Sequence, residues 1–162
     1  MIPGDVPARP FALSDAAMRI LPLIAALALP LAGCATVPTP PQGLSDTSWR
    51  FVSFTGTDDA QNMIVTDGRP YALTFHGDGR VTGQLDCNRL TGSWNEGALG
   101  GKTVSLYLSP MAMTRMACPP GSFDIEIAGM LPDVASYKMA KGDLRLALKM
   151  DQGTLAFEPL EN

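Results

Sequence analysis

The stretch that decides the fold reads GRVTGQLDCNRLTGSW and spans residues 79–94. Its apolar residues Val81 and Leu85 fall on one face and polar residues on the other, and a period of two predicts a half-buried β-strand. The turn Gly77-Asp78-Gly79 comes just before, and glycines accept the positive backbone angles of a tight hairpin. Because residues 71–75 alternate in the same way, we expect a β-hairpin here.

Similar alternation along the rest of the chain predicts about seven short strands. Polar residues Thr55–Pro70 are expected to form a long loop, and the Cys87-Asn88-Arg89 triplet a turn. Three of the expected inward-facing sets are Trp49, Phe51 and Ser53; Ala135, Tyr137 and Met139; and Leu144, Leu146, Leu148 and Met150.

One helix is expected after Pro119-Pro120-Gly121, with Ser122 as a plausible cap. Phe123, Ile127, Met130 and Leu131 recur on one helical face until Pro132 ends it. A closed or nearly closed antiparallel barrel leaves few exposed strand edges. The predicted fold is therefore mainly β: a small antiparallel β-barrel-like domain of about seven strands with one packed α-helix.

The amino-terminal segment has the pattern of an export signal. Arg19 precedes an apolar run, residues 20–31, that is shorter than the roughly 20 residues a spanning helix needs. The run closes with Leu31-Ala32-Gly33-Cys34, which resembles the lipobox of bacterial lipoproteins. We therefore expect a signal region at 1–33, a lipidated Cys and flexible tether at 34–43, and a domain at 44–160. Met18 is a second candidate start.

In lipoproteins of that kind the Cys thiol is acylated, so the resemblance implies that Cys34 is the lipid attachment site and the membrane a partner. Ala35 in place of Asp favours sorting to the outer membrane, on its periplasmic face, by analogy with enteric lipoproteins. The alternative is that Cys34 is a chance thiol at the end of an ordinary signal peptide or of a buried helix.

Two further cysteines, Cys87 and Cys118, form an even pair in a domain expected to be exported. Such a pair in an oxidising compartment favours a disulfide, and two buried free thiols are the alternative. No metal site is expected, because two cysteines with His76 as the single histidine do not supply a four-ligand zinc shell.

Charge and composition exclude several function classes. The chain carries a formal net charge of -4, which disfavours nucleic acid as a partner. His76 lies beside a turn without a nearby nucleophile, and the aspartates do not have the spacing of a calcium loop. We expect neither an enzyme nor a cofactor.

Two runs resemble the META domain, the HslJ-like family. Residues 79–94 are similar to the family's GR(V/I)xGxxGCNxxxGxY/W run, and Met113–Pro119 (MTRMACP) is similar to its T(R/L)MAC run. Asp86 stands where the family usually has Gly. The resemblance implies a barrel-like β fold with a packed helix in exported proteins, some linked to heat shock or antibiotic tolerance. It supplies no catalytic residue.

The motif residues Asn88, Arg89, Thr114 and Arg115 have two interpretations. They form a shared binding surface, or they have structural roles, which we favour. In the structural interpretation Asn88 bonds its own backbone and tolerates a left-handed turn beside the disulfide, and Thr114 with Arg115 ties the irregular connection between Leu108 and Pro120 to the barrel. Three nearby methionines serve adaptable cores and binding surfaces alike, and core packing is the default; they are Met111, Met113 and Met116.

The sequence thus predicts a non-enzymatic envelope lipoprotein that acts in envelope stress or maintenance through protein or small-ligand binding. An envelope protein is the expected partner. The alternative is a periplasmic inhibitor of a hydrolase such as lysozyme or a protease, with the Thr55–Pro70 loop inserted in the cleft. A carrier of apolar ligands is third, and it needs a cavity inside the barrel.

Overall fold

The computed structural model describes residues 43–57, 62–98 and 101–160. The predicted signal region and Cys34 lie outside these residues, as does the tether apart from Gly43. No helix in the described part of the chain is long and apolar enough to cross a membrane.

Within the described residues the chain forms ten strands, one α-helix and two short 3₁₀ turns. The helix α1 spans Asp124–Met130, and the 3₁₀ turns span Leu131–Asp133 and Lys149–Asp151. The strands are β1 (Thr47–Gly56), β2 (Met63–Ile64), β3 (Tyr71–Phe75), β4 (Arg80–Leu85), β5 (Asn88–Gly97), β6 (Thr103–Leu108), β7 (Ala112–Met113), β8 (Val134–Ala140), β9 (Asp143–Leu148) and β10 (Gly153–Pro159).

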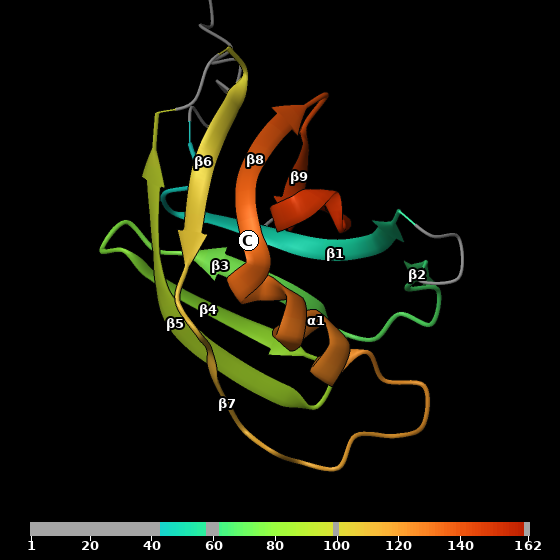
Figure 1. The fold of residues 1–162 in the computed structure, drawn as a ribbon. Coiled ribbons are helices and arrows are strands. Elements are labelled where there is room, and N and C mark those ends of the chain that lie inside the picture. The colour runs from blue at the N-terminus through green and yellow to red at the C-terminus, as the bar shows by residue number, and fades with distance from the viewer. Residues whose placement is uncertain (1–42, 58–61, 99–100, 161–162) are drawn as a thin grey trace, which may run out of the picture. The chain divides into compact units, whose positions relative to one another are not determined.

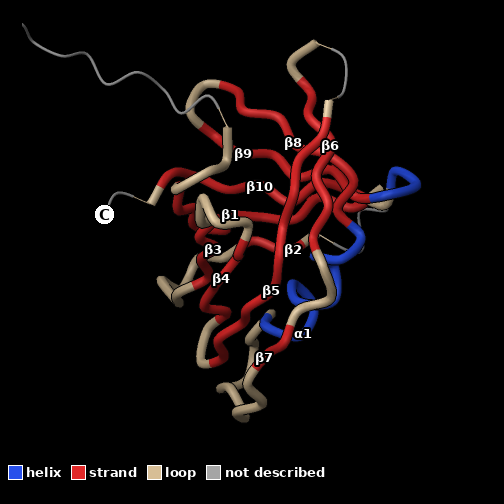
Figure 2. The backbone as a smooth tube through the Cα atoms, turned by 90° about the vertical axis from the view of Figure 1, so that its left-hand side faces the viewer, coloured by secondary structure: helices blue, strands red, loops and turns tan. Residues whose placement is uncertain are grey.

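Eight of these strands close into an antiparallel barrel (Figures 1 and 2). The order β10-β9-β8-β6-β5-β4-β3-β1 returns to its start because β1 also pairs with β10. The two remaining strands are accessory: β2 pairs with β1 and β7 with β5. The predicted barrel with one helix is confirmed, but the count of about seven strands is too low. Two-residue strands are too short for an alternation to show.

Large aromatic side chains fill the interior of the barrel. The ring of Phe51 meets those of Tyr71 and Phe157 edge to face, with centroids 6.4 and 5.5 Å apart. Phe75 and Trp94 form a third such pair at 5.4 Å. These rings occupy the space that a carrier of apolar ligands would need.

Two β-bulges change which side chains point inward. A register shift between Phe51 and Ser53 turns Phe54 into the core, so the expected inward position of Ser53 is wrong. A second shift in β8 buries Val134 in place of Ala135. A bulge inserts one residue and reverses the alternation beyond it, which a strict period of two does not anticipate.

Met150 was expected to continue the inward-facing set of β9, and it does not. The strand ends at Leu148, and Met150 adopts a left-handed conformation (φ 52°) in the following 3₁₀ turn. Its side chain is 85% exposed. The tight return to β10 therefore takes precedence over the apolar pattern.

Three predicted local features also need correction. The turn after β4 consists of Asp86 and Cys87, so β5 already begins at Asn88. The expected loop 55–70 includes the end of β1 and all of β2. Phe123, and not Ser122, is the residue that precedes α1.

Tyr71 shows why the helix begins where it does. Its hydroxyl accepts a hydrogen bond from the backbone N–H of Phe123 at 3.0 Å. The hydroxyl of Ser122 lies 3.4 Å from the N–H of Asp124, a long contact. A long-range contact from β3 therefore takes the place of the local cap that the sequence predicts.

Candidate functional site

Asn88 is the centre of a buried hydrogen-bond network. It is the first residue of β5 and only 1% exposed. Its amide nitrogen donates to the carboxylate of Asp124 at 2.8 Å and to the carbonyl of Met116 at 3.1 Å. Its amide oxygen accepts from the N–H of Met116 at 2.8 Å and from the hydroxyl of Thr114 at 2.9 Å. One side chain thus holds the start of α1 and the segment before it.

The connecting segment, defined here as residues 109–123 between β6 and α1, is irregular apart from β7. Thr114 ties it to β5 a second time, because its hydroxyl accepts from the N–H of Arg89 at 2.9 Å and its own N–H donates to the Arg89 carbonyl at 3.0 Å. The disulfide between Cys87 and Cys118 is formed and joins the same two parts of the chain. The disulfide expected from the sequence is therefore present.

The backbone conformation of Asp86 explains why the family usually has glycine at this position. Asp86 adopts a left-handed conformation (φ 53°), which glycine reaches without steric cost. Asp tolerates this conformation better than most residues, and its buried carboxylate pairs with Arg69 at 3.2 Å. Arg69 also donates to the carbonyl of Pro120 at 3.0 Å. The substitution therefore adds a link from the turn to the connecting segment.

Neighbouring carboxylates stabilise the positive charge of Arg69. Partial burial lowers its pKa, but the carboxylates of Asp67 and Asp86 outweigh this effect, so the pKa is raised above its ordinary value. The nearer carboxylate, that of Asp67, lies 2.7 Å from the Arg69 Nε. Arg69 thus stays a cation and a donor under all ordinary conditions.

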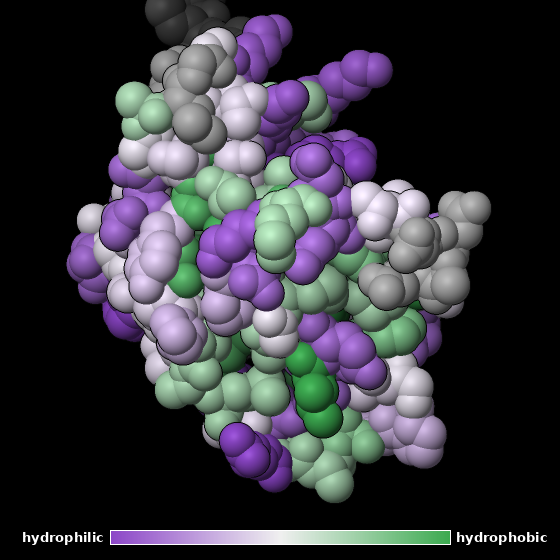
Figure 3. Space-filling model, viewed as in Figure 1, coloured by the Kyte–Doolittle hydropathy of each residue, from purple (hydrophilic) through white to green (hydrophobic). Residues whose placement is uncertain are grey.

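A groove of about 540 Å³ lies between the connecting segment and α1. We call it the methionine groove, because three of its lining residues are methionines. Met116 and Ile125 on its walls are 62% and 72% exposed, unusual values for large apolar side chains. Figure 3 shows hydrophobic surface gathered over α1 and the segment after β7. The lining residues are Asn88, Met111, Met113, Arg115, Met116, Ala117, Asp124, Ile125, Ala128 and Gly129.

Two glycines leave room beside the methionine groove. A Cβ placed on Gly129 would meet no atom within 4 Å, so α1 presents empty space there. On the opposite side Gly92 of β5 lies directly under Met111, because a Cβ at Gly92 would come within 2.4 Å of the thioether sulfur. Gly92 belongs to the family motif, and because it has no side chain, the Met111 sulfur can pack directly against β5.

Two charged side chains of opposite sign line the methionine groove. Asp124 is 6% exposed, and its carboxylate accepts from Asn88. Arg115 is exposed and forms no ion pair with any described residue. Their formal charges cancel, so the groove is close to neutral overall.

The structure separates the four motif residues proposed from the sequence. Asn88, which is buried, and Thr114, which is exposed, both belong to the hydrogen-bond network through their side chains, whereas Arg89 takes part only through its backbone. Thr114 forms the predicted tie between the connecting segment and the barrel, whereas Arg115 lines the methionine groove. The local role expected of Asn88 is wrong: the left-handed residue is Asp86, and Asn88 lies in β5 and bonds Met116 and Asp124.

Sequence reasoning missed the helix side of the groove. Asp124 is a buried acid at the first helical position, and Ile125 is an exposed apolar residue beside it. The sequence signal available was Asp124 followed by Ile125, an apolar residue outside the predicted apolar face of the helix. This pair indicates a site only once Asn88 is known to bond Asp124.

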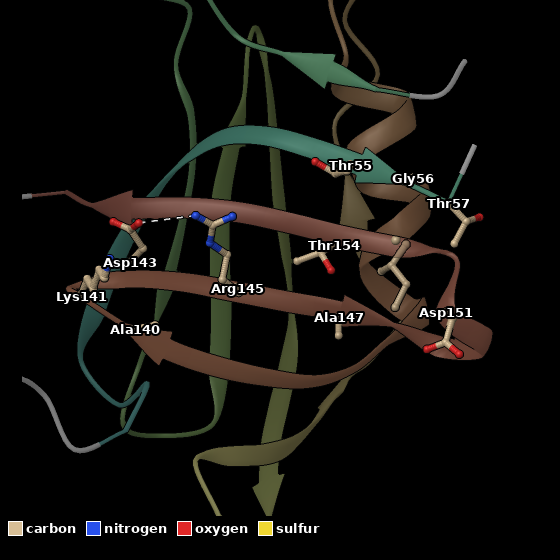
Figure 4. A pocket seen from close by; sticks show the side chains of 12 residues that line it. Thr55, Gly56, Thr57, Ala140, Lys141, Asp143, Arg145, Ala147, Asp151 and Thr154 are labelled. Atoms are coloured by element: carbon tan, nitrogen blue, oxygen red, sulfur yellow. Dashed lines mark ion pairs between the residues drawn. The ribbon is translucent and has the colours of Figure 1, made fainter. Parts of the chain in front are cut away.

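A second hollow, the polar basin, has about 770 Å³ and lies against β1, β8, β9 and β10 (Figure 4). Asp143 and Arg145 form an ion pair within it at 3.6 Å. Its lining is mostly polar or small: Thr55, Gly56, Thr57, Ala140, Lys141, Asp143, Arg145, Ala147, Leu148, Asp151, Gly153 and Thr154. No buried side-chain network stands behind it among the described residues.

The other candidate residues have structural partners. The imidazole of His76 lies 2.8 Å from the Thr82 hydroxyl, and its carbonyl accepts from the Trp94 indole at 3.0 Å. Within residues 43–57, 62–98 and 101–160 there is no group of three or more His, Cys, Asp or Glu placed to hold a metal ion.

Most of the chain matches a known protein family. The model of the META domain matches residues 42–162, three quarters of the chain. The chain belongs to the META domain family. The match includes Asn88, both disulfide cysteines and α1, so the buried network and the groove lie inside the family domain. A search of curated proteins finds no match.

Two NMR structures show the same fold. An NMR structure of a protein from Burkholderia xenovorans is 25% identical, with a TM-score of 0.59, and the match covers 79% of this chain and 94% of that one. A second NMR structure is 27% identical, with a TM-score of 0.50 and coverage of 75% and 94%. A DUF4847 family protein from Bacteroides vulgatus is 20% identical, with a TM-score of 0.48 and coverage of 71% and 93%.

Proposed function

We propose that this META domain protein is a non-enzymatic binding protein of the bacterial envelope, anchored through a lipid on Cys34, and that it binds its ligand in the methionine groove. The groove is the observation that carries the proposal. It combines exposed apolar walls at Met116 and Ile125 with a backbone fixed by the buried Asn88 network. Preorganised apolar hollows with few polar groups are typical binding sites.

The chemistry around the groove supports binding more than catalysis. The Asp124 carboxylate already accepts a hydrogen bond from Asn88. Apart from Asp124, the described groove lining holds no side chain that could act as a general base or a nucleophile. Acid–base or nucleophilic catalysis needs a pair of groups within hydrogen-bond reach of a common reacting atom. Binding needs only the apolar walls and their fixed spacing.

Export and lipidation rest on the pattern before Cys34. Metabolic labelling with an alkyne fatty acid is expected to mark the wild-type protein but not Cys34→Ser, and Cys34→Ser is expected to leave the membrane fraction. Equal membrane association of both proteins would overturn the anchor. Sorting to the outer membrane, suggested by Ala35, is tested by density separation of the two membranes.

Binding at the groove is tested by photo-crosslinking in living cells. A benzophenone amino acid at Ile125 is expected to give a discrete adduct. The matched control is Tyr107, which is also exposed but lies on β6 outside the groove lining. Adducts of equal yield from both positions would show that contact at Ile125 is not specific, and the groove would then lose its assigned role.

A further inference from the structure

Three methionines line the methionine groove, and their thioether sulfurs are soft metal ligands. Met113 ends β7, and Met111 immediately precedes the strand. The Met111 sulfur lies over Gly92, the next position in the register with β5, so the side chains of Met111 and Met113 point to the same side. Met113 pairs with Leu90, whose side chain is buried, and this places both methionines on the inner side. Met116 follows three residues after Met113 in the connecting segment and lines the same groove.

The network around Asn88 fixes the third methionine relative to the other two. Both the N–H and the carbonyl of Met116 are hydrogen-bonded to the Asn88 side chain, at 2.8 and 3.1 Å. Met111 rests on Gly92 of the same strand that carries Asn88. The backbones are therefore held. Met111 and Met113 also pack against the hydrophobic core, and binding of an ion requires these unbranched thioether side chains to change rotamer.

We propose that Met111, Met113 and Met116 form a binding site for a soft monovalent metal ion, Cu(I) or Ag(I). Thioethers are neutral, polarisable donors that select Cu(I) over hard cations. Asp124 and Arg115 cancel in formal charge, so the groove offers no excess negative charge to a divalent ion. The inference rests on the proposed function only in that both use the methionine groove.

The soft metal donors in the groove lining are the three methionine thioethers. Cys87 and Cys118 are joined to each other and offer no thiolate. A thioether carries no proton, so ion binding releases none, unlike binding by thiolate or imidazole. The affinity is therefore independent of pH between about 5 and 8, which separates this donor set from one that includes His or carboxylate groups.

The test is titration of the full chain carrying Cys34→Ser, labelled with ¹³C at the methionine methyl groups, with Ag(I) as a redox-stable probe. Cys34→Ser removes the one thiol outside the disulfide. The methyl signals of Met111, Met113 and Met116 are expected to shift together and to saturate at one equivalent. Met150, the most exposed methionine described, is the internal control and is expected to stay unchanged.

A matched pair of variants completes the experiment. Met116→Leu retains an apolar side chain of similar volume at an exposed position and is expected to weaken Ag(I) binding at least tenfold, whereas Met150→Leu leaves it unchanged. Equal shifts at Met150, no saturation, or a tenfold loss of affinity from pH 8 to pH 5 would each overturn the site. These outcomes leave the crosslinking and lipid-labelling results unaffected, so the two proposals fail separately.

Discussion

The polar basin and the methionine groove differ in the contacts that hold their walls. The polar basin is the larger, at about 770 Å³, but it is the outer surface of regular strands and its one ion pair is half exposed. The methionine groove is smaller, at about 540 Å³, and is built by an irregular segment held by Asn88, Thr114 and a disulfide. Size alone is therefore a poor guide to a site. The fixed polar network marks the hollow whose shape the chain maintains.

The largest effect is expected from Asn88→Ala. The variant leaves the buried Asp124 carboxylate without its amide donor and removes the partner of the Met116 N–H, so unfolding free energy falls by about 3–5 kcal/mol. Urea unfolding measures it. Asn95→Ala on the exposed part of the same strand is the control, with a change below about 0.5 kcal/mol. Similar losses in both variants would contradict the network.

Removal of the disulfide by Cys87→Ser with Cys118→Ser ranks next. The two residues are 31 positions apart, and the chain-entropy model gives a loss of about 3–4 kcal/mol. Thermal unfolding with and without a reductant checks this. We expect a lower Tm in the variant and no further effect of the reductant on it. An unchanged Tm would mean that the hydrogen bonds alone hold the connecting segment.

A smaller effect of opposite sign is expected from Gly129→Ala. A Cβ there meets nothing within 4 Å, and alanine favours the helix, so α1 gains about 0.5–1 kcal/mol. The added methyl group points into the open space beside the methionine groove. On the same variant, urea unfolding measures the change in stability, and the Ile125 crosslink measures whether the added methyl group changes binding in the groove. A loss of stability would show that the space is not empty.

The smallest effect is expected in the polar basin. Asp143→Asn breaks the ion pair with Arg145, but both side chains are about half exposed, and such pairs contribute between zero and about 1 kcal/mol. Unfolding at low and high salt is the measurement, and any difference from the wild type is expected to shrink as salt rises. A loss comparable to that of Asn88→Ala would erase the distinction between the two hollows.

Much of the fold could be predicted from sequence because most strands obey a simple alternation. The inward positions of β3, β4 and β6 follow it, and so does the hairpin at Gly77–Gly79. The failures lie where one residue disturbs the register. The bulges in β1 and β8 reverse the facing of Ser53 and Ala135, and the tight turn at Met150 exposes an apolar side chain.

The candidate site could be predicted only in part, because its contacts are long-range. Asn88 and Thr114 were recognisable from the motif, but they are 26 residues apart and meet only in the folded chain. The partner Asp124 lies 36 residues from Asn88, and no local pattern links them. Core packing, the default expectation for the three methionines, holds for Met111 and Met113, which pack against the core, but not for Met116, which is 62% exposed. The groove appears only when α1 is placed beside the connecting segment.

The central claim is that Asn88 fixes the connecting segment as one wall of the methionine groove. Hydrogen exchange at the amide of Met116 tests it most directly, because this N–H donates to the Asn88 side chain although it lies in no strand or helix. The account predicts exchange at least ~100-fold slower than in a free peptide, with the protection lost in Asn88→Ala. Free exchange of this amide in the wild-type protein would contradict the account.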